Sequence, residues 1–219
     1  MILPDEGFDP FVAPDEEAAR TALLGRFDDA ADGLDAYAAM LATKAIEWGL
    51  MGPREGDKVW SRHIGNSLAL VDVLGLGLEV ADVGSGAGLP GLPLALVRPD
   101  LGVVLVEPLL RRATFLSEAV EELGLGDRVT VERSRAEECR RQFDVVVCRA
   151  VAPLERLLKW TTPLFLPDGE LVALKGLTAE REVVEATRVL ARSGLAAEIL
   201  ELRASPEVEA TRAIRVKAL

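Results

Sequence analysis

The stretch VADVGSGAGLPGLPLALVRPDLGVVLVEP, residues 80–108, decides the fold of this 219-residue chain. A short apolar run leads into a glycine-rich turn, which is followed by an apolar segment and then by a second apolar run that ends in Glu107. This order predicts a strand, a tight turn, a helix and a second strand. In parallel sheets, such a unit holds a nucleotide-like ligand at the turn.

Glycines remove side chains where a backbone has to turn and approach a ligand closely, and they stand here at Gly84, Gly86, Gly88 and Gly91. Pro90 suits the first turn of the helix that follows. We therefore expect free N–H groups of this helix to face an anionic part of the ligand. Glu107 stands where an acid accepts hydrogen bonds from ribose hydroxyls, which indicates a ribose without a 2′-phosphate.

Two ligands compete for this turn. GAGLPG, residues 86–91, matches the G-x-G-x-x-G pattern of NAD sites. Read from Asp82, the same turn is D-x-G-x-G-x-G, a pattern that S-adenosylmethionine sites use, and Asp82 and Ser85 are polar where a dinucleotide site is usually apolar. No Lys-Ser/Thr pair follows the glycines, which excludes a phosphate-binding P-loop. The pattern favours S-adenosylmethionine, and an NAD-dependent oxidoreductase stays as an alternative.

The first third of the chain is predicted to be helical. Residues 1–14 are rich in acids and prolines, which predicts an irregular segment. Asp15 is a suitable N-cap for a first helix, and apolar residues at three- and four-residue spacing predict further helices over residues 34–48 and 59–74. The segment GLMGPREGD, residues 49–57, contains three glycines and a proline and is predicted to separate these two helices.

From residue 77 onward, strand and helix patterns alternate. Five short runs that contain valine are apolar at successive positions, as expected for strands covered on both faces. Two last runs, residues 196–204 and 211–219, are close enough in sequence to pair antiparallel at a sheet edge. We predict an α/β fold whose mostly parallel, seven-stranded sheet is formed by residues 77–219, with residues 15–76 as an N-terminal helical extension.

Charge and residue counts limit the function classes. A net charge of −11 argues against broad, non-specific binding to nucleic acids, which requires a cationic protein. Cys139 and Cys148 are isolated and there is a single histidine, so no metal site is expected. We find neither a signal peptide nor an apolar run of the roughly 20 residues that a membrane helix needs. We expect a cytoplasmic protein, without metal or membrane contact, that acts as a monomer.

Four motifs occur in the order and spacing of one bacterial family: RHIGNSLAL at 62–70, DVGSGAGLPGLPLAL at 82–96, FDVVVCRAVAPLERLLKW at 143–160 and PDGELVALKG at 167–176. In combination they resemble the glucose-inhibited division protein B family, which is the ribosomal RNA small subunit methyltransferase G family. The resemblance implies a class I, Rossmann-like S-adenosylmethionine-dependent methyltransferase. It also implies methylation of N7 of one guanosine in 16S rRNA, with the small ribosomal subunit as partner. A non-catalytic ribosome-assembly factor with this fold is the second alternative.

The resemblance also implies roles for single residues. Contacts with the cofactor are expected from Gly84, Ser85, Gly86, Leu89, Glu107, Ala136, Glu137 and Arg149. Contacts with RNA are expected from His63, Arg149 and Lys175. Residues 47–60 depart from the Asn-Leu-Thr-like sequence that the family often has before the RHI motif, and Gly65 and Asn66 replace an apolar residue and an aspartate.

The implied reaction requires few catalytic groups. Guanine N7 carries a lone pair and no proton, so its methylation needs no general base. The enzyme has to align the reacting atoms, and orientation of this kind supplies about 7–11 kcal/mol in the best cases. Arg149, at the end of the fourth predicted strand, is the positioning candidate because an arginine can bind a phosphate or guanine O6. Cys148 is expected to face the core. For His63, a local hydrogen bond and a contact with RNA stay open as alternatives.

Overall fold

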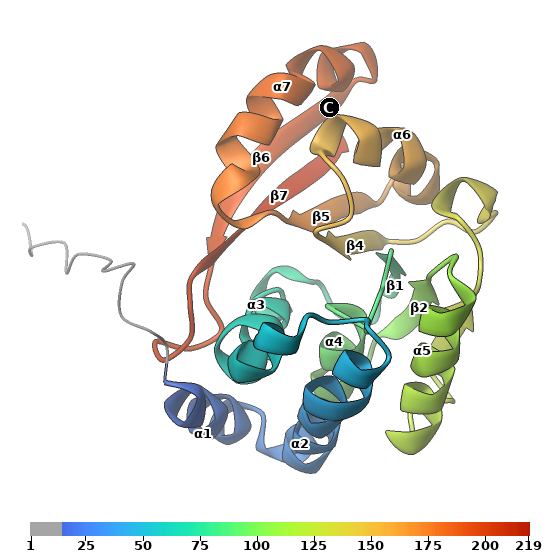
Figure 1. The fold of residues 1–219 in the computed structure, drawn as a ribbon. Coiled ribbons are helices and arrows are strands. Elements are labelled where there is room, and N and C mark those ends of the chain that lie inside the picture. Colours follow the sequence, from blue (N-terminus) through green and yellow to red (C-terminus); the bar gives the residue numbers. More distant parts are fainter. Residues whose placement is uncertain (1–14) are drawn as a thin grey trace, which may run out of the picture.

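The computed structural model describes residues 15–219, and the irregular segment predicted for residues 1–14 lies outside them. Seven strands form a sheet in the order β3-β2-β1-β4-β5-β7-β6 (Figure 1). Their bounds are Glu79–Val83 (β1), Gly102–Val106 (β2), Val129–Glu132 (β3), Val145–Arg149 (β4), Glu170–Leu174 (β5), Leu195–Leu202 (β6) and Thr211–Ala218 (β7).

The first five strands run parallel to one another, as predicted. β1 pairs with β2 on one side and with β4 on the other, so that Ala81 lies opposite both Val104 and Val146. At such a reversal of strand order, the loops after the two strands diverge and leave room for a ligand. β7 lies between β5 and β6 and is antiparallel to both, which confirms the predicted antiparallel pair at the edge.

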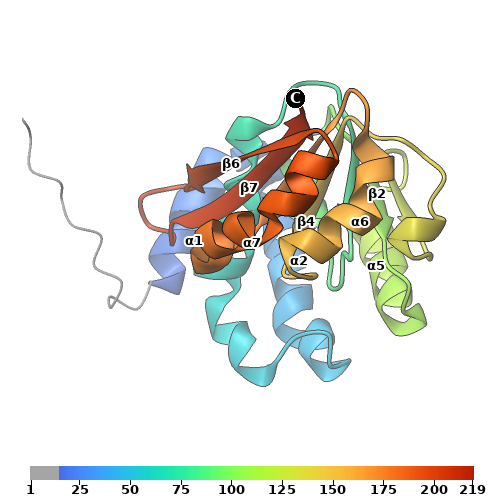
Figure 2. The same ribbon diagram turned by 90° about the horizontal axis from the view of Figure 1, so that it is seen from above.

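Helices cover both faces of the sheet (Figures 1 and 2). α4 (Gly91–Val97) and α5 (Leu110–Glu122) pack on one face together with the N-terminal helices, whereas α6 (Leu154–Phe165) and α7 (Ala179–Arg192) pack on the other. The central strands are therefore buried on both sides, which explains why their sequences are apolar at successive positions. Within residues 15–219, none of the helices combines the length and the apolar character that crossing a membrane requires.

The first two predicted helices are confirmed. α1 (Glu16–Arg26) begins after Asp15, whose side chain accepts hydrogen bonds from the N–H groups of Glu17 and Ala18 at 3.0 and 3.2 Å. This contact satisfies two N–H groups that have no partner inside the helix. α2 (Ala31–Met40) continues into a wider π-helical turn (Leu41–Ala45), so the helix extends past Met40 as predicted.

The region between residues 49 and 74 differs in detail from the prediction. The predicted break contains a 3-10 helix, η3 (Pro53–Lys58). The third predicted helix is divided into a π-helical turn, η4 (Val59–Ile64), the short α3 (Gly65–Leu68) and a 3-10 turn (Val71–Val73). Glycines and a proline do end the preceding helix, as predicted. The segment that follows them is nevertheless helical, and η3 packs against the helical turns on both sides of it.

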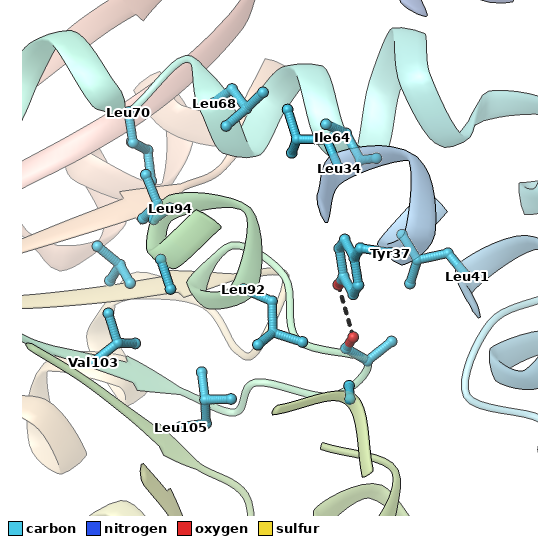
Figure 3. Packing of buried hydrophobic residues seen from close by; sticks show 14 of the residues in the cluster. Leu34, Tyr37, Leu41, Ile64, Leu68, Leu70, Leu92, Leu94, Val103 and Leu105 are labelled. Atoms are coloured by element: carbon cyan, nitrogen blue, oxygen red, sulfur yellow. Dashed lines mark hydrogen bonds between the residues drawn. The ribbon is translucent and has the colours of Figure 1, made fainter. Parts of the chain in front are cut away.

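A hydrophobic core joins the N-terminal helices to the sheet (Figure 3). Leu34 and Tyr37 of α2 and Leu41 of the π-helical turn share this core with Leu92 of α4. The Tyr37 hydroxyl donates a hydrogen bond of 2.8 Å to the carbonyl oxygen of Ala87, inside the glycine-rich turn. The N-terminal helices thus support the turn from one side. The division of the chain at residue 77 stays a prediction, since this core contains residues from both sides of it.

Candidate active site

A cavity of about 740 Å³ lies at the carboxyl ends of β1, β2 and β4, where the strand order predicts a ligand. All of the residues expected to contact the cofactor line it: Gly84, Ser85, Gly86, Leu89, Glu107, Ala136, Glu137 and Arg149. His63 lines the cavity as well. Residues that are far apart in the sequence therefore meet at one site.

The glycine-rich turn after β1 needs glycine for two different reasons. Gly84 has φ +73°, and a Cβ on it would lie 2.8 Å from a methyl carbon of Val151. Gly86 has φ +60°, but a Cβ there would approach only a backbone oxygen, at 3.8 Å. Both glycines thus supply a positive φ, and Gly84 in addition permits close packing against the loop after β4, whereas Gly86 leaves the cavity open.

Asp82 anchors the turn from beneath. Its side chain is fully buried, and Oδ2 accepts a hydrogen bond of 2.9 Å from the N–H of Gly91, the first residue of α4. Burial raises the pKa of Asp82 to about 7. The expectation that free N–H groups of this helix face the ligand was wrong. The preceding residue, Pro90, has no N–H, and the first amide of α4 is already bonded to Asp82.

Glu107 connects the loop after β1 to the loop after β2 on one side of the cavity. Its carboxylate is 1% exposed, and Oε2 accepts a hydrogen bond of 3.1 Å from the N–H of Gly86. Oε1 accepts one of 3.0 Å from the N–H of Leu109, and Arg112 Nη1 lies 3.8 Å from Oε2. A carboxylate offers about four acceptor positions, so Glu107 can still accept hydrogen bonds from a ligand hydroxyl.

Arg149 ends β4 on the opposite side of the cavity, and it contacts His63. Its Nη1 donates a hydrogen bond of 3.2 Å to the carbonyl oxygen of His63, and its Nη2 lies 2.6 Å from His63 Nδ1. A guanidinium can only donate hydrogen bonds, so Nδ1 must accept and the ring proton must be on Nε2. Nε2 lies 2.8 Å from Glu55 Oε2. The contacts of His63 with Arg149 on one side and Glu55 on the other therefore agree on one tautomer of the histidine, with the proton on Nε2.

The charge state of His63 agrees with this arrangement. Burial, followed by the positive charge of Arg149, lowers the pKa of His63 to about 4. The ring is neutral at physiological pH and supports Arg149 as a hydrogen-bond acceptor. The structure gives His63 a buried hydrogen bond to Arg149, which is 86 residues away, and not the local hydrogen bond of the first alternative. Its contact with RNA stays a prediction.

The loop after β4 is held by a buried ion pair. Lys175 Nζ lies 2.8 Å from Glu182 Oε2 and also donates to the carbonyl oxygen of Ala152. Glu182 accepts a hydrogen bond of 2.8 Å from the N–H of Leu154. Ala150, at the start of this loop, has φ +52°, a conformation that is strained for a residue with a Cβ. Lys175 thus supports this loop and does not line the 740 Å³ cavity.

The sequence reasoning missed part of the cavity wall. Leu50, Met51, Gly52 and Glu55 line it from the segment that we interpreted as a helix break, and Trp160 lines it from α6. An acid in a glycine- and proline-rich segment has no periodic pattern that would mark its side chain. Glu55 lies next to His63 because η3 packs against η4.

Comparison with known proteins gives consistent relatives. A sequence model described as rRNA small subunit methyltransferase G matches residues 31–207. The ribosomal RNA small subunit methyltransferase G of Kineococcus radiotolerans is 47% identical over 94% of this chain and 82% of its own length. The protein of the same name from Mycolicibacterium paratuberculosis is 50% identical over 84% of this chain and 79% of its own length.

Solved structures share the fold at low sequence identity. The ribosomal protein L11 methylase of Lactobacillus delbrueckii has a TM-score of 0.53 and 18% identity, over 70% of this chain and 76% of that chain. M. jannaschii TYW2, solved in complex with AdoMet, has a TM-score of 0.52 and 16% identity, over 68% and 70%. The fold is that of class I methyltransferases with N-terminal helices added. By the family match and by its close relatives, the chain belongs to the rRNA small subunit methyltransferase G family.

Proposed function

We propose that this protein transfers the methyl group of S-adenosylmethionine to N7 of a guanosine in 16S rRNA of the small ribosomal subunit. Membership of the family supports the substrate class. One structural observation supports the chemistry: Arg149 stands in the cavity wall as a fixed cation, supported by a histidine that is neutral and already bonded. We further propose that the protein works in the cytoplasm and as a monomer.

The residues of the cavity fit S-adenosylmethionine. Glu107 has acceptor positions left that would bind the ribose hydroxyls, and its contact with Gly86 holds its carboxylate beside the turn. Gly86 leaves open space beside the turn for the methionine part. Ala136 and Glu137 line the cavity from the segment after β3 and would border the adenine. When bound, S-adenosylmethionine supplies an electrophilic methyl group on a sulfonium sulfur.

The groups near the cavity are suited to positioning rather than to proton transfer or nucleophilic attack. His63 is neutral, its Nδ1 accepts from Arg149, and its Nε2 is buried 2.8 Å from the Glu55 carboxylate. Cys148 is fully buried, and burial raises the pKa of its thiol to about 12, so no thiolate is available. Guanine N7 needs neither a base nor a covalent intermediate, which makes it the acceptor that this site suits best.

Arg149 has the role of placing the guanine. Its guanidinium keeps N–H groups beyond the two that contact His63, and these can donate to guanine O6, the neighbour of N7 on the same edge of the base. A donor at O6 fixes the base in its plane. The reaction then depends on alignment, which supplies about 7–11 kcal/mol where it is complete.

The test is methyl transfer from labelled S-adenosylmethionine to small ribosomal subunits from cells that lack this enzyme. Digested nucleosides are identified by mass. We expect 7-methylguanosine, and we expect Arg149→Ala to reduce its formation at least 100-fold while Arg188→Gln, on the exposed part of α7, leaves it unchanged. A labelled product other than 7-methylguanosine would contradict the proposed acceptor.

The two alternatives predict different results. A non-catalytic assembly factor binds the cofactor and the subunit but transfers no label to subunits or to free 16S rRNA. An NAD-dependent oxidoreductase is stabilised against heat by NAD rather than by S-adenosylmethionine. A true ligand at 100 times its Kd raises the free energy of unfolding by about 2.7 kcal/mol, which a thermal-shift assay resolves.

A further inference from the structure

A second cavity, of about 500 Å³, adjoins the cofactor cavity. The two share a wall formed by Arg149, Ala150 and Val151. The second cavity lies beyond the ends of β4 and β5 and contains donor groups from several elements. Its polar lining residues are Arg62, Asn66, Arg149, Lys175, Thr178, Glu182 and Thr211.

The charges in this lining do not balance. Lys175 and Glu182 neutralise each other as a buried pair, with 2.8 Å between Nζ and Oε2. Arg149 and Arg62 are the other two charged residues of the lining. Within residues 15–219, no carboxylate oxygen lies within ion-pair distance of Arg149. Arg62 lies 3.6 Å from Glu55 and its side chain is 42% exposed, so Arg149 is, among the described residues of the lining, the buried cation that has no carboxylate partner.

Two guanidinium groups in one cavity repel each other. Burial, and after it the charge of Arg62, lowers the pKa of Arg149 to about 10. Buried charges in proteins are nearly always paired, because a charge without a partner loses its hydration without compensation. In a chain of net charge −11, a buried arginine without a carboxylate partner, placed beside a second arginine, requires a specific reason. An anionic ligand supplies the missing partner.

The chemistry of the lining identifies the anion. Arginine forks bind phosphate oxygens through paired N–H groups, and Asn66, Thr178 and Thr211 add neutral donors. Arg62 lines the second cavity but not the cofactor cavity, so the carboxylate of the cofactor does not account for it. The shared wall places the second cavity next to the base that would react in the first.

We infer that the second cavity is a phosphate subsite, in which Arg62 and Arg149 bind the phosphodiester beside the methylated nucleotide. This inference rests on the proposed function, because it takes the acceptor to be RNA. It assigns Arg62 to the binding of substrate. It also explains how an acidic protein binds a polyanion: the phosphate contacts are concentrated in one cavity.

The experiment compares Arg62→Gln with the matched control Arg188→Gln, and uses small ribosomal subunits from cells lacking the enzyme as the probe. The Kd for subunits and the KM of methyl transfer are measured at several salt concentrations. Each phosphate contact contributes about 0.7–0.9 to the slope of log K against log salt. We expect Arg62→Gln to reduce this slope by about one and to raise KM about 10-fold. Arg62→Lys should keep most of the slope, because it keeps the charge.

A smaller probe tests the same point without the ribosome. Guanosine 5′-monophosphate and guanosine are compared as inhibitors of methyl transfer. We expect the wild type to prefer the monophosphate about 10-fold and Arg62→Gln to lose this preference. Thermal unfolding and the Kd for S-adenosylmethionine, which should stay as in the wild type, show that Arg62→Gln is folded.

The outcomes separate this inference from the proposed function. If the wild type methylates subunits, and Arg62→Gln matches it in salt slope and in preference for the monophosphate, the phosphate subsite is refuted and the proposed function stands. If the wild type transfers no methyl group but Arg62→Gln still weakens subunit binding and lowers the slope, the subsite stands and the proposed function fails.

Discussion

The loops after β1 and β4 wall the same cavity but are held in different ways. The β1 loop, residues 84–90, is shaped by glycines with positive φ and by short-range hydrogen bonds, such as the one of 2.7 Å from the N–H of Gly88 to the carbonyl oxygen of Ser85. Contacts with Tyr37 and Glu107 add to this backbone framework. The β4 loop, residues 150–153, is held by side chains from distant segments. Arg149 is fixed by His63, which is 86 residues away, and Ala152 by Lys175.

This difference decides what can be predicted. A loop that is held by its own backbone requires particular residues at fixed spacing, and those form a motif. A loop held by distant side chains requires only that a donor or acceptor arrives from elsewhere in the fold. The following predictions test whether the two loops depend on these different supports.

The largest expected effect is on the support of the β4 loop. Lys175→Met leaves the Glu182 carboxylate buried without its cation, and removing one partner of such a pair costs about 3–5 kcal/mol. Urea unfolding measures the free energy of unfolding. Lys159→Met, an exposed lysine on α6, is the control and should change it by less than about 0.5 kcal/mol. The double variant Lys175→Met/Glu182→Gln should recover at least half of the loss, because no buried charge is left.

The next effect is on the β1 loop. Gly88 has φ +98°, and a Cβ on it would lie 2.4 Å from Cδ1 of Leu92 and 3.1 Å from the Tyr37 hydroxyl. We expect Gly88→Ala to lower the free energy of unfolding by about 2–4 kcal/mol, from backbone strain and overpacking together. Gly124 has φ +65° but open space around it, so Gly124→Ala should cost only about 1 kcal/mol. Equal losses in the free energy of unfolding at the two positions would show that the packing around Gly88 does not exclude a Cβ.

A smaller effect concerns the placement of Arg149. Glu55→Leu removes the carboxylate that lies 2.8 Å from Nε2 of His63 and favours the proton there, so that the contact with Arg149 alone is left to set the tautomer. We expect kcat for subunit methylation to fall about 10-fold, which corresponds to the loss of one hydrogen bond to a charged group. Glu55→Gln keeps an acceptor and should retain most of the activity. If both variants lose activity equally, the carboxylate charge rather than the tautomer is what matters.

The last effect is a pH dependence, to which His63 and Asp82 contribute with opposite signs. The pKa of His63 is lowered to about 4, so between pH 4 and 6.5 the unfolded chain binds a proton that the folded chain does not, and stability rises with pH. The pKa of Asp82 is raised to about 7, so between pH 3.8 and 7 the folded chain binds the extra proton, and stability falls as pH rises. The two contributions oppose each other from pH 4 to 6.5.

Asp82→Asn separates these contributions. It removes the titrating group and keeps an acceptor for the N–H of Gly91. Relative to the wild type, its free energy of unfolding should gain a positive slope of up to about 1.4 kcal/mol per pH unit between pH 4 and 6.5. Urea unfolding at pH 4.5, 5.5 and 6.5 measures this slope. Parallel pH profiles of the two proteins would mean that Asp82 is ionised in the folded state.

The sequence by itself determined the fold class, the parallel and antiparallel parts of the sheet and the turn at which the cavity opens. Successive apolar positions, glycine spacing and an acid at the end of β2 are local signals, and they express the backbone geometry that each strand and turn requires. The expected cofactor residues were named from the family resemblance, and all of them line the cavity. They stand at the ends of strands, where parallel pairing brings distant segments to one edge.

Only the tertiary structure decided how the polar groups pair. It bonded the first amide of α4 to Asp82, placed Glu55 on His63, and directed Lys175 to Glu182. These contacts depend on how helices far apart in the chain pack, and each residue type involved could equally face solvent. A hydrogen bond constrains two atoms in space and leaves no constraint on their separation along the chain, so no local pattern records it.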